Sequence, residues 1–519
     1  MTRPRPVFCV IEHLHRDRAL AEAVASGVFT FAGETRALGV EPDWLHADLP
    51  DDEEWRIDWV KFYYGLDLAD AFRATGDERF LRAWERLVAS FVVQVPPDHD
   101  PSDVTARRIV NWIYAWQRLP EADVPGLVES IGEQARHVRA NLTATRNHRT
   151  LELYALLIVA LALPELGIEP PVAELHENLI TDFGVDGVHR ERSTHYHLIA
   201  LRSFVGALEN CRRFGVALPA GFEERLARAC EFARDCRRPD GTIPALSDSD
   251  TGNYDELLRL AGRLLSRDDL LVGRANVYAD GGYAIQRHGD RYLIFDCGPL
   301  GDGGHGHYDA LSVEAWAGAH ALVLDPGRFT YAEGEPNLRR WFRGTAAHNT
   351  VCVDGTDQTP YARGRSAKPS AEADLLRASD TELVAEVRSP VYEAIHRRRV
   401  VFVDGRCWVI EDVLTGERPH RYDLRWHLAP GRAQLWEGGV TSPTVAITID
   451  GAQSIALEDG WISPRYGFRL SALVVSAVAT GTDARFVTLL APREPGAQVP
   501  ALHVEGDSVY VGDNRVVLR

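Results

Sequence analysis

The chain has 519 residues, more than one hydrophobic core usually organises, so we expect two or three domains. Hydrophobic residues make up 45% of the chain and charged residues 25%, which excludes a disordered or fibrous protein. The 57 Lys and Arg residues against 75 Asp and Glu residues leave a net charge of −18, which argues against a nucleic-acid partner.

No apolar run reaches the ~20 residues that a membrane helix needs, so we expect no membrane partner. The apolar run at residues 7–11 is shorter than the ~7–15 residues found in a secretory signal peptide. The seven cysteines are an odd number without close spacing, which is typical of reduced thiols and not of a cysteine zinc site. These features predict a cytoplasmic protein and make bacterial periplasmic export the less favoured alternative.

Apolar residues recur every three or four positions through the first half of the chain, which predicts about ten helices joined by short loops. The clearest segments are residues 59–72, 80–95, 109–119, 127–142, 151–163, 198–214, 226–236 and 257–265. Gly76 is expected to end one helix and Asp77 to cap the next. Helical hairpins of this length pack as a bundle, a solenoid or a closed toroid, and periodicity does not choose among them.

From about residue 269 the hydrophobic period changes to two, which predicts strands. The alternating runs are residues 283–298, 311–327, 397–416, 420–431, 444–451 and 508–518. Asp404-Gly405 lies between two alternating stretches and predicts a hairpin turn. No helical pattern interrupts these runs, so we expect antiparallel sheets in a sandwich or a stack. The fold class is therefore a helical domain over residues 1–268 followed by an antiparallel β domain over residues 269–519.

Two polar clusters lie beside helices of the first domain. Asn147-His148 opens an apolar helix, and an N-cap at Asn147 with a surface His148 would explain both residues. The segment 191–197 contains four side chains able to transfer protons, just before another helix, although helix capping and a solvated loop remain an equal alternative. Within it, Tyr196 is a usable base only if nearby cations lower its pKa from about 10.

Two further clusters lie in the β domain. Residues 303–309 combine three glycines with a His-x-His pair, which places both imidazoles on one side of an extended chain. Asp325-Pro326-Gly327 alone predicts a turn, and His348 alone is explained as a buried core histidine. Together, His307, Asp325 and His348 would form a nitrogen and oxygen donor set suited to zinc, although their distant positions leave that site open.

Taken in order, these motifs resemble the heparinase II/III superfamily of polysaccharide lyases, which includes alginate, heparin and heparan lyases. The matching pieces are Asn147-His148, Glu191-x-Ser-x-x-Tyr196-His197, Gly304-His305-Gly306-His307-x-Asp309, Asp325-Pro326-Gly327 and Ala347-His348-Asn349-Thr350-Val351. The resemblance implies an N-terminal (α/α) toroid followed by a C-terminal antiparallel β domain. It also implies β-elimination at a uronic acid, in which C5 loses a proton, the C4–O bond breaks and an unsaturated uronate forms.

The resemblance implies four catalytic residues. Asn147 and His148 would neutralise the uronate carboxylate, as preorganised donors do at developing negative charge. Tyr196 would exchange protons with C5, with the leaving O4 or with both, and His305 would serve as base for the opposite C5 epimer. Candidate substrate-binding residues are Arg192, Glu191, His197, Arg343 and Tyr331, of which the two arginines are candidate carboxylate clamps.

The resemblance also implies that His307, Asp325 and His348 hold a structural Zn²⁺ ion. The expected partner is an anionic poly- or oligosaccharide, and the sequence leaves its identity, endo or exo action and the oligomeric state open. A uronate C5-epimerase would need the same proton abstraction and remains an alternative. A non-catalytic saccharide-binding protein of a polysaccharide biosynthesis system is a second alternative. A glycoside hydrolase using Asp248 and Asp250 would leave the His and Tyr clusters without a role.

Overall fold

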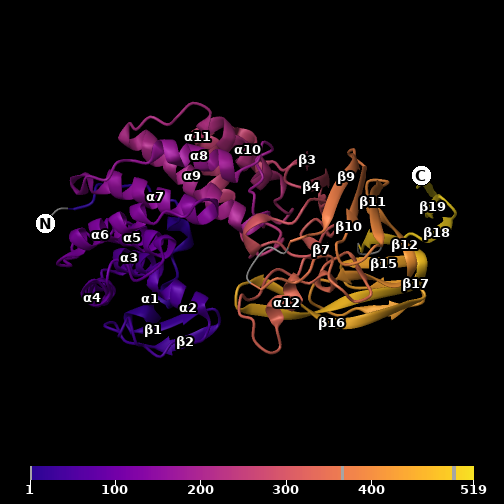
Figure 1. The fold of residues 1–519 in the computed structure, drawn as a ribbon, viewed down its shortest axis with the longest axis horizontal. Helices are drawn as coiled ribbons and strands as arrows, with labels where there is room; N and C mark the ends of the chain where they lie inside the picture. The colour runs from indigo at the N-terminus through magenta and orange to yellow at the C-terminus, as the bar shows by residue number, and fades with distance from the viewer. Residues whose placement is uncertain (1–2, 364–367, 494–497, 519) are drawn as a thin grey trace. The chain divides into compact units, whose positions relative to one another are not determined.

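The computed structural model describes residues 3–363, 368–493 and 498–518. Contacts divide the chain into two compact units, each described here by itself. The first unit comprises Met1–Phe183, Ile199–Ala227 and Leu260–Arg267, and the second comprises Gly184–Leu198, Arg228–Arg259 and Asp268–Arg519. The helix-rich part precedes the strand-rich part along the chain, as predicted (Figure 1).

Eleven helices are described before residue 268, close to the predicted number. They are α1 (Arg18–Ala25), α2 (Glu53–Val60), α3 (Tyr64–Thr75), α4 (Glu78–Gln94), α5 (Ser102–Trp116), α6 (Leu127–Ala140), α7 (Arg146–Ala162), α8 (Val172–Asp182), α9 (Thr194–Phe214), α10 (Phe222–Asp235) and α11 (Asp255–Leu265). Successive helices pack in the pairs α3–α4, α5–α6 and α7–α8, while α3, α5 and α7 form a continuous row, with α5 packed against both α3 and α7. Nearly every residue of α5 and α7 is buried, whereas α4 and α6 bury one face. These inner and outer layers are the arrangement of an (α/α) toroid, so the predicted fold class is confirmed.

Local signals account for some helix boundaries and fail at others. Gly76 ends α3 with a φ of 69°, and the Asp77 carboxylate caps α4 by accepting from the Arg79 N–H at 3.0 Å. The N-cap interpretation of Asn147 is wrong, because Thr145 occupies that position and Asn147 lies in the first turn of α7. The hairpin β1 (Val28–Phe31) and β2 (Glu34–Ala37) was not predicted, because four-residue strands are too short for a periodic signal.

The second unit contains two large antiparallel sheets and one small sheet. Its strands are β3 (Asn276–Tyr278), β4 (Tyr283–His288), β5 (Arg291–Asp296), β6 (Val313–Ala317), β7 (His320–Val323), β8 (Val351–Val353), β9 (Glu372–Ala378), β10 (Glu382–Arg388), β11 (Ile395–Val403), β12 (Cys407–His427), β13 (Gln434–Trp436), β14 (Gly439–Thr441), β15 (Val445–Asp450), β16 (Ser454–Arg465), β17 (Phe468–Pro492), β18 (Leu502–Glu505), β19 (Ser508–Val511) and β20 (Asn514–Val517). Strands β3 to β7 form a five-stranded sheet, β8 to β17 a ten-stranded sheet, and β18 to β20 a three-stranded sheet. Side chains from the first two sheets share one hydrophobic core, which confirms the predicted stack.

The second unit departs from the sequence analysis at one strand and at one helix, and agrees with it at one turn. The runs at 397–416 and 420–431 are joined by β12, which continues through residues 416–419 because it pairs with β17 on both sides of that irregular stretch. The predicted turn at Asp404-Gly405 is confirmed, with φ angles of 51° and 68°. The expectation of a β half without helices is wrong, since α12 (Leu338–Arg343) interrupts the strands and, as shown below, supports the site.

The described cysteines are all free and buried. Among the described residues, the helices are too short or too polar to cross a membrane.

Candidate active site

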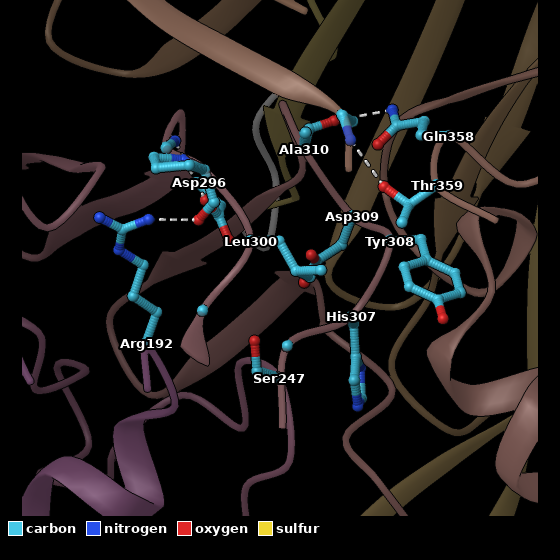
Figure 2. Close-up of a pocket in the computed structure, with 15 residues that line it drawn as sticks. Arg192, Ser247, Asp296, Leu300, His307, Tyr308, Asp309, Ala310, Gln358 and Thr359 are labelled. Carbon is cyan, nitrogen blue, oxygen red and sulfur yellow. Dashed lines mark hydrogen bonds between the residues drawn. The ribbon is translucent and has the colours of Figure 1, made fainter. Parts of the chain in front are cut away.

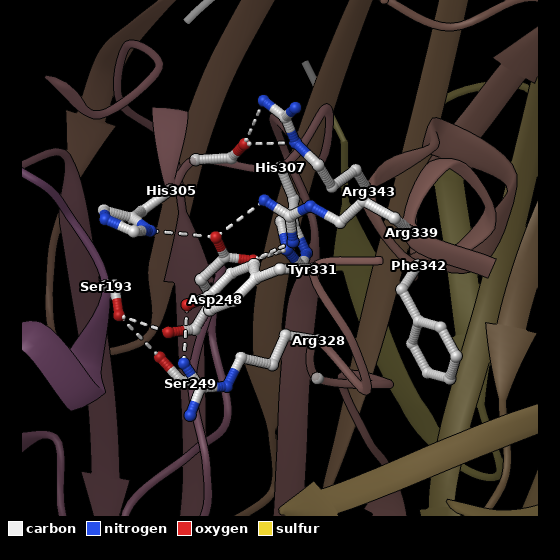
Figure 3. Close-up of polar contacts among 12 residues, drawn as sticks. Ser193, Asp248, Ser249, His305, His307, Arg328, Tyr331, Arg339, Phe342 and Arg343 are labelled. Carbon is white, nitrogen blue, oxygen red and sulfur yellow. Dashed lines mark hydrogen bonds and ion pairs between the residues drawn. The ribbon is translucent and has the colours of Figure 1, made fainter. Parts of the chain in front are cut away.

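Tyr196 lies in the first turn of α9, in the part of this helix that belongs to the second unit. The Ser193 hydroxyl caps this turn by accepting from the Tyr196 N–H at 3.3 Å. The Ser249 hydroxyl accepts from the His195 N–H at 3.1 Å and lies 2.9 Å from Ser193 Oγ. The loop that contains Ser249 therefore anchors the start of α9 and the tyrosine on it (Figure 3).

His305 stacks on the Tyr196 ring, with centroids 3.9 Å apart and planes 28° from parallel. Its Nδ1 donates to Asp248 Oδ2 at 3.0 Å, and its Nε2 lies 3.6 Å from Glu191 Oε2. Both carboxylates are buried, whereas the imidazole is 19% exposed. The stacked pair is therefore held by buried acids and stays partly exposed.

Glycines allow the His-x-His loop to follow this path. Gly304 has a φ of 87°, a conformation that other residues rarely adopt. At Gly301, a Cβ atom would lie 2.1 Å from the carbonyl oxygen of Glu191, so only glycine fits against that backbone. These glycines bring the loop against the segment that carries Glu191 and Tyr196.

A chain of hydrogen bonds joins Tyr196 to a cation. Its Oη lies 2.8 Å from Tyr331 Oη, to which Arg328 Nη1 donates at 2.6 Å. The Arg328 guanidinium also pairs with both oxygens of Asp250, at 2.9 and 2.8 Å. Burial raises the pKa of Tyr331 well above its usual value, although Arg328 acts in the opposite direction, so Tyr331 stays a neutral phenol. Arg328 is thus connected to Tyr196 through one hydroxyl group, that of Tyr331.

Asp248 is a buried carboxylate that contacts both histidines of the loop. His305 Nδ1 donates to its Oδ2, and His307 Nε2 donates to its Oδ1 at 2.9 Å. Arg339, on α12, pairs with both carboxylate oxygens, with Nη2 2.7 Å from Oδ2 (Figure 3). Burial alone would raise the pKa of Asp248, but Arg339 and the two histidines hold it well below its usual value. Asp248 is therefore ionised, which makes it unsuitable as the proton donor that a glycoside hydrolase would need.

His307, Asp325 and His348 form a buried group whose donor atoms all lie within 4.8 Å of one another. Among the described residues, His307 Nδ1 has no hydrogen-bond partner, while the ring's other nitrogen donates to Asp248. His348 Nε2 donates to the Phe342 carbonyl at 3.1 Å, and its Nδ1 lies 2.8 Å from Asp325 Oδ2. Both imidazoles thus direct Nδ1 into the group while Nε2 is held outside it, as outer hydrogen bonds orient metal-ligating histidines. The three residues fit a divalent transition metal.

The ionisation of the two histidines differs. Burial lowers the pKa of His307 to about 4, so its ring is neutral at physiological pH and has a lone pair to offer. Burial would also lower the pKa of His348, but the adjacent Asp325 carboxylate raises it to about 9.

Three of the predicted substrate-binding residues contact backbone atoms. Arg343 is buried and donates to the carbonyls of Gly306 and Ala362 at 3.2 and 3.0 Å. Arg192 donates to the carbonyls of residues 299 and 280 at 2.6 and 2.7 Å. His197 is 1% exposed and donates from Nε2 to the Ala229 carbonyl at 3.0 Å, and burial lowers its pKa to about 3. These side chains hold the loops of the site in place.

A small pocket is lined in part by the loop that carries His307 (Figure 2). Its walls include Arg192, Ser247, Asp296, His307 and Asp309. Burial raises the pKa of Asp296 well above its usual value, and the nearby Asp309 carboxylate raises it further. Asp296 therefore favours its neutral form in this pocket.

Asn147 and His148 belong to the first unit. Asn147 is 3% exposed, whereas the His148 side chain is 48% exposed, with Nδ1 4.0 Å from Asp103 Oδ2. Asp103 also pairs with Arg107. Burial would raise the pKa of Asp103, but Arg107 and His148 lower it below its usual value. The two predicted residues thus lie at a charged cluster on α5 and α7.

The sequence analysis missed the residues that connect the second-unit site. It gave Asp248, Asp250, Arg328 and Arg339 no role in the proposed chemistry. The polar run at residues 247–250 was a usable signal, because four hydrogen-bonding side chains follow an apolar stretch. The two arginines had no signal, because their carboxylate partners lie 78 and 91 positions away in the sequence.

Two family models match the chain. The model described as Heparinase II/III N-terminus matches residues 14–265, and the model described as Heparinase II/III-like, C-terminal, matches residues 272–491. The chain belongs to the heparinase II/III family.

Curated relatives in this family are named for lyase activity. The chain is 23% identical to a heparin-sulfate lyase of Bacteroides stercoris, in a match that covers 92% of this chain and 81% of the relative. It is 21% identical to a heparin-sulfate lyase of Bacteroides thetaiotaomicron, covering 75% of this chain and 63% of that protein.

Solved structures share the fold. Heparinase III superposes with a TM-score of 0.82 at 17% identity, covering 100% of this chain and 93% of that one. Heparan sulfate lyase from Pedobacter heparinus gives a TM-score of 0.64 at 16% identity, covering 99% and 89%. Chondroitin AC lyase from Streptomyces coelicolor A3 gives 0.58 at 12% identity, covering 97% and 83%. With this family and these relatives, the protein is a polysaccharide lyase, an enzyme that cleaves its polysaccharide substrate by β-elimination.

Proposed function

We propose that this lyase acts on an anionic, uronate-containing poly- or oligosaccharide and that His305 and Tyr196 carry its two proton transfers. The observation that supports this most is the stacked, partly exposed pair of these side chains, backed by buried acids on one side and by Arg328 on the other. The resemblance to heparin-sulfate lyases supports a sulfated glycosaminoglycan as the first substrate to test.

The reaction needs a base because the C5 proton lies beside a carboxylate and is barely acidic. We propose that His305 Nε2 takes this proton, the electron pair of the C5–H bond forms the C4–C5 double bond, and the C4–O4 bond breaks. The imidazolium that results lies between Asp248 and Glu191, whose negative charges stabilise it. This environment favours the protonated product of the base step.

We propose that Tyr196 gives its proton to the departing O4. The phenolate left behind is hydrogen-bonded to Tyr331, which in turn accepts from Arg328, so positive charge stabilises it. For Asn147 and His148 we propose neutralisation of the uronate carboxylate, which the enolate-like transition state requires.

We propose that His307, Asp325 and His348 hold Zn²⁺, which would supply a fixed charge that ties three loops of the second unit together. His307 would bind through Nδ1, the nitrogen left available by its contact with Asp248. The metal takes no part in either proton transfer.

A panel of heparan sulfate, heparin, alginate, hyaluronan and chondroitin tests this proposal by the ultraviolet absorbance of the conjugated double bond. We expect absorbance on at least one polymer and a loss of about 10²-fold or more in kcat for Tyr196→Phe, because general acid catalysis contributes about 10²–10⁴-fold. Tyr422→Phe is a matched control, because Tyr422 on β12 is buried and its hydroxyl donates a hydrogen bond to the Thr482 carbonyl. No absorbance together with deuterium entering C5 from heavy water would overturn the proposal in favour of an epimerase.

A further inference from the structure

One carboxylate contacts both the proposed base and a proposed metal ligand. Asp248 accepts from His305 Nδ1 at 3.0 Å and from His307 Nε2 at 2.9 Å, one on each oxygen. Arg339 donates to the same two oxygens. Each oxygen therefore receives one N–H from a histidine and one from the arginine, and the carboxylate has no exposed surface.

This pattern dictates where the histidine protons are. A carboxylate paired with a guanidinium only accepts, so both histidine nitrogens that face it are N–H groups. A neutral His305 then has its lone pair on Nε2, which faces Glu191 and is the nitrogen that the proposed reaction uses. A neutral His307 has its lone pair on Nδ1, which faces the metal group.

We propose that Asp248 is a positioning residue that sets the tautomers of His305 and His307 together and thereby links metal binding to proton transfer. The inference rests on the proposed function, because it concerns the same base. Loss of the metal would allow His307 to shift. Because Asp248 is hydrogen-bonded to His307, its carboxylate would shift as well, and His305 would lose the contact that orients it.

Backbone contacts tighten this link. The Asp248 N–H donates to the His305 carbonyl at 3.0 Å, and Arg339 Nη2 donates to the Gly304 carbonyl at 3.3 Å. Arg339 and Phe342 both lie on α12, and the Phe342 carbonyl accepts from His348. The short helix therefore contacts Asp248 through one residue and a proposed metal ligand through another.

The test is Asp248→Asn. Asparagine offers one acceptor oxygen and one donor nitrogen, so it satisfies only one of the two histidines in the present tautomers. We expect kcat to fall by about 10–100-fold with KM changed by less than about 3-fold, and zinc affinity to fall by about 10–100-fold, as for other residues that orient metal ligands.

Asp235→Asn is a matched control for the loss of a buried carboxylate. Asp235 has no exposed surface, pairs with Arg234 through both oxygens at 2.7 and 2.8 Å, and accepts from the Tyr278 hydroxyl at 2.6 Å. We expect this variant to lose comparable thermal stability while keeping the kcat and the zinc content of the wild type. Equal losses of kcat and zinc in both variants would overturn the proposal, as would wild-type kcat and zinc content in Asp248→Asn.

Two readouts do not depend on turnover. One is zinc bound per chain after dialysis against limiting Zn²⁺ alone, and the other is the ¹⁵N spectrum of labelled histidines, with His305→Gln and His307→Gln to assign the two rings. We expect Nδ1-protonated His305 and Nε2-protonated His307 in the zinc-loaded wild type, and a changed tautomer in Asp248→Asn. The opposite tautomers in the wild type would overturn the proposal.

The two proposals fail in different ways. If no polymer gives an unsaturated product, the proposed function fails, whereas the zinc content and the histidine spectra still test the role of Asp248. If Asp248→Asn does not fold, Asp248→Glu keeps the charge for Arg339 but moves the oxygens by one methylene. We then expect the same selective loss of kcat and zinc, and wild-type values would overturn the proposal.

Discussion

Replacing Arg328 by glutamine removes the cation at the end of the Tyr196–Tyr331 hydrogen-bond chain while keeping an amide N–H that can donate to Tyr331. Hydrogen bonds of 2.6 and 2.8 Å join the guanidinium to Tyr196 Oη, so the charge lies about 5 Å from that oxygen. At an effective dielectric constant of about 20, a unit charge at about 5 Å contributes about 3 kcal/mol. Tyr196 is only half-buried, and solvent screening reduces this to about 1–2 kcal/mol.

We therefore expect Arg328→Gln to lower kcat by about 5–30-fold with little change in KM, because the interaction forms with the phenolate and not with the bound substrate. Initial rates of ultraviolet absorbance on the preferred polymer measure both constants. Thermal unfolding measures the separate cost of leaving the Asp250 carboxylate without its guanidinium, about 1–3 kcal/mol.

The double variant Arg328→Gln, Asp250→Asn separates these effects. It removes the unpaired carboxylate, so we expect most of the stability to return while kcat stays low. If the double variant regains wild-type kcat, or if Arg328→Gln alone keeps kcat within about 2-fold, electrostatic support of Tyr196 by Arg328 is refuted.

Three further predictions concern a carboxylate, the metal group and stability in acid. Glu191→Gln removes a buried charge 3.6 Å from His305 Nε2, so we expect kcat to fall by about 10-fold or more, and an unchanged kcat would contradict the stabilised imidazolium. Chelation of the purified protein is expected to release about one zinc ion per chain and to lower the thermal midpoint, and far less than one zinc per chain, measured without added metal, would rule out the zinc assignment. Asp412 is paired with Arg398 and His396, which hold its pKa below the usual 3.8 although burial acts to raise it. The ionised Asp412 therefore contributes its full stabilisation above pH 3.8, and this stabilisation is lost as the pH falls below 3.8. We expect the free energy of unfolding to decline in that acidic range, and to decline less in Asp412→Asn than in the wild type.

Local patterns were sufficient for the order of the secondary structure and for the family. The helical and alternating periods follow from which side chains must face a core, and this depends only on neighbours in the sequence. The turn at Asp404-Gly405 was predictable for the same reason, since two adjacent residues with positive φ suffice to make it. His305 and His307 do contact the same carboxylate, but His305 has φ −90° and ψ −14°, so the extended backbone assumed for the His-x-His spacing is not what brings the rings together.

Local patterns misled where long-range pairing overrides them. Residues 416–419 contain a glycine and a proline and read as a break, yet β12 continues through them because β17 pairs with it on both sides. Asn147 read as a helix cap, whereas Thr145 occupies that position and Asn147 is buried in the first turn of α7.

Only the tertiary structure decided how the site is connected. Asp248 reaches His305 and His307 across 57 and 59 positions and Arg339 across 91, and no periodicity or turn preference carries information over such separations. The metal group was expected from the family resemblance, but its orientation depends on acceptors supplied by Asp248 and Phe342, which lie on other segments. A hydrogen bond is specified by the positions of two atoms in space, so the tautomers of the histidines became readable only once the folded chain had brought their acceptors together.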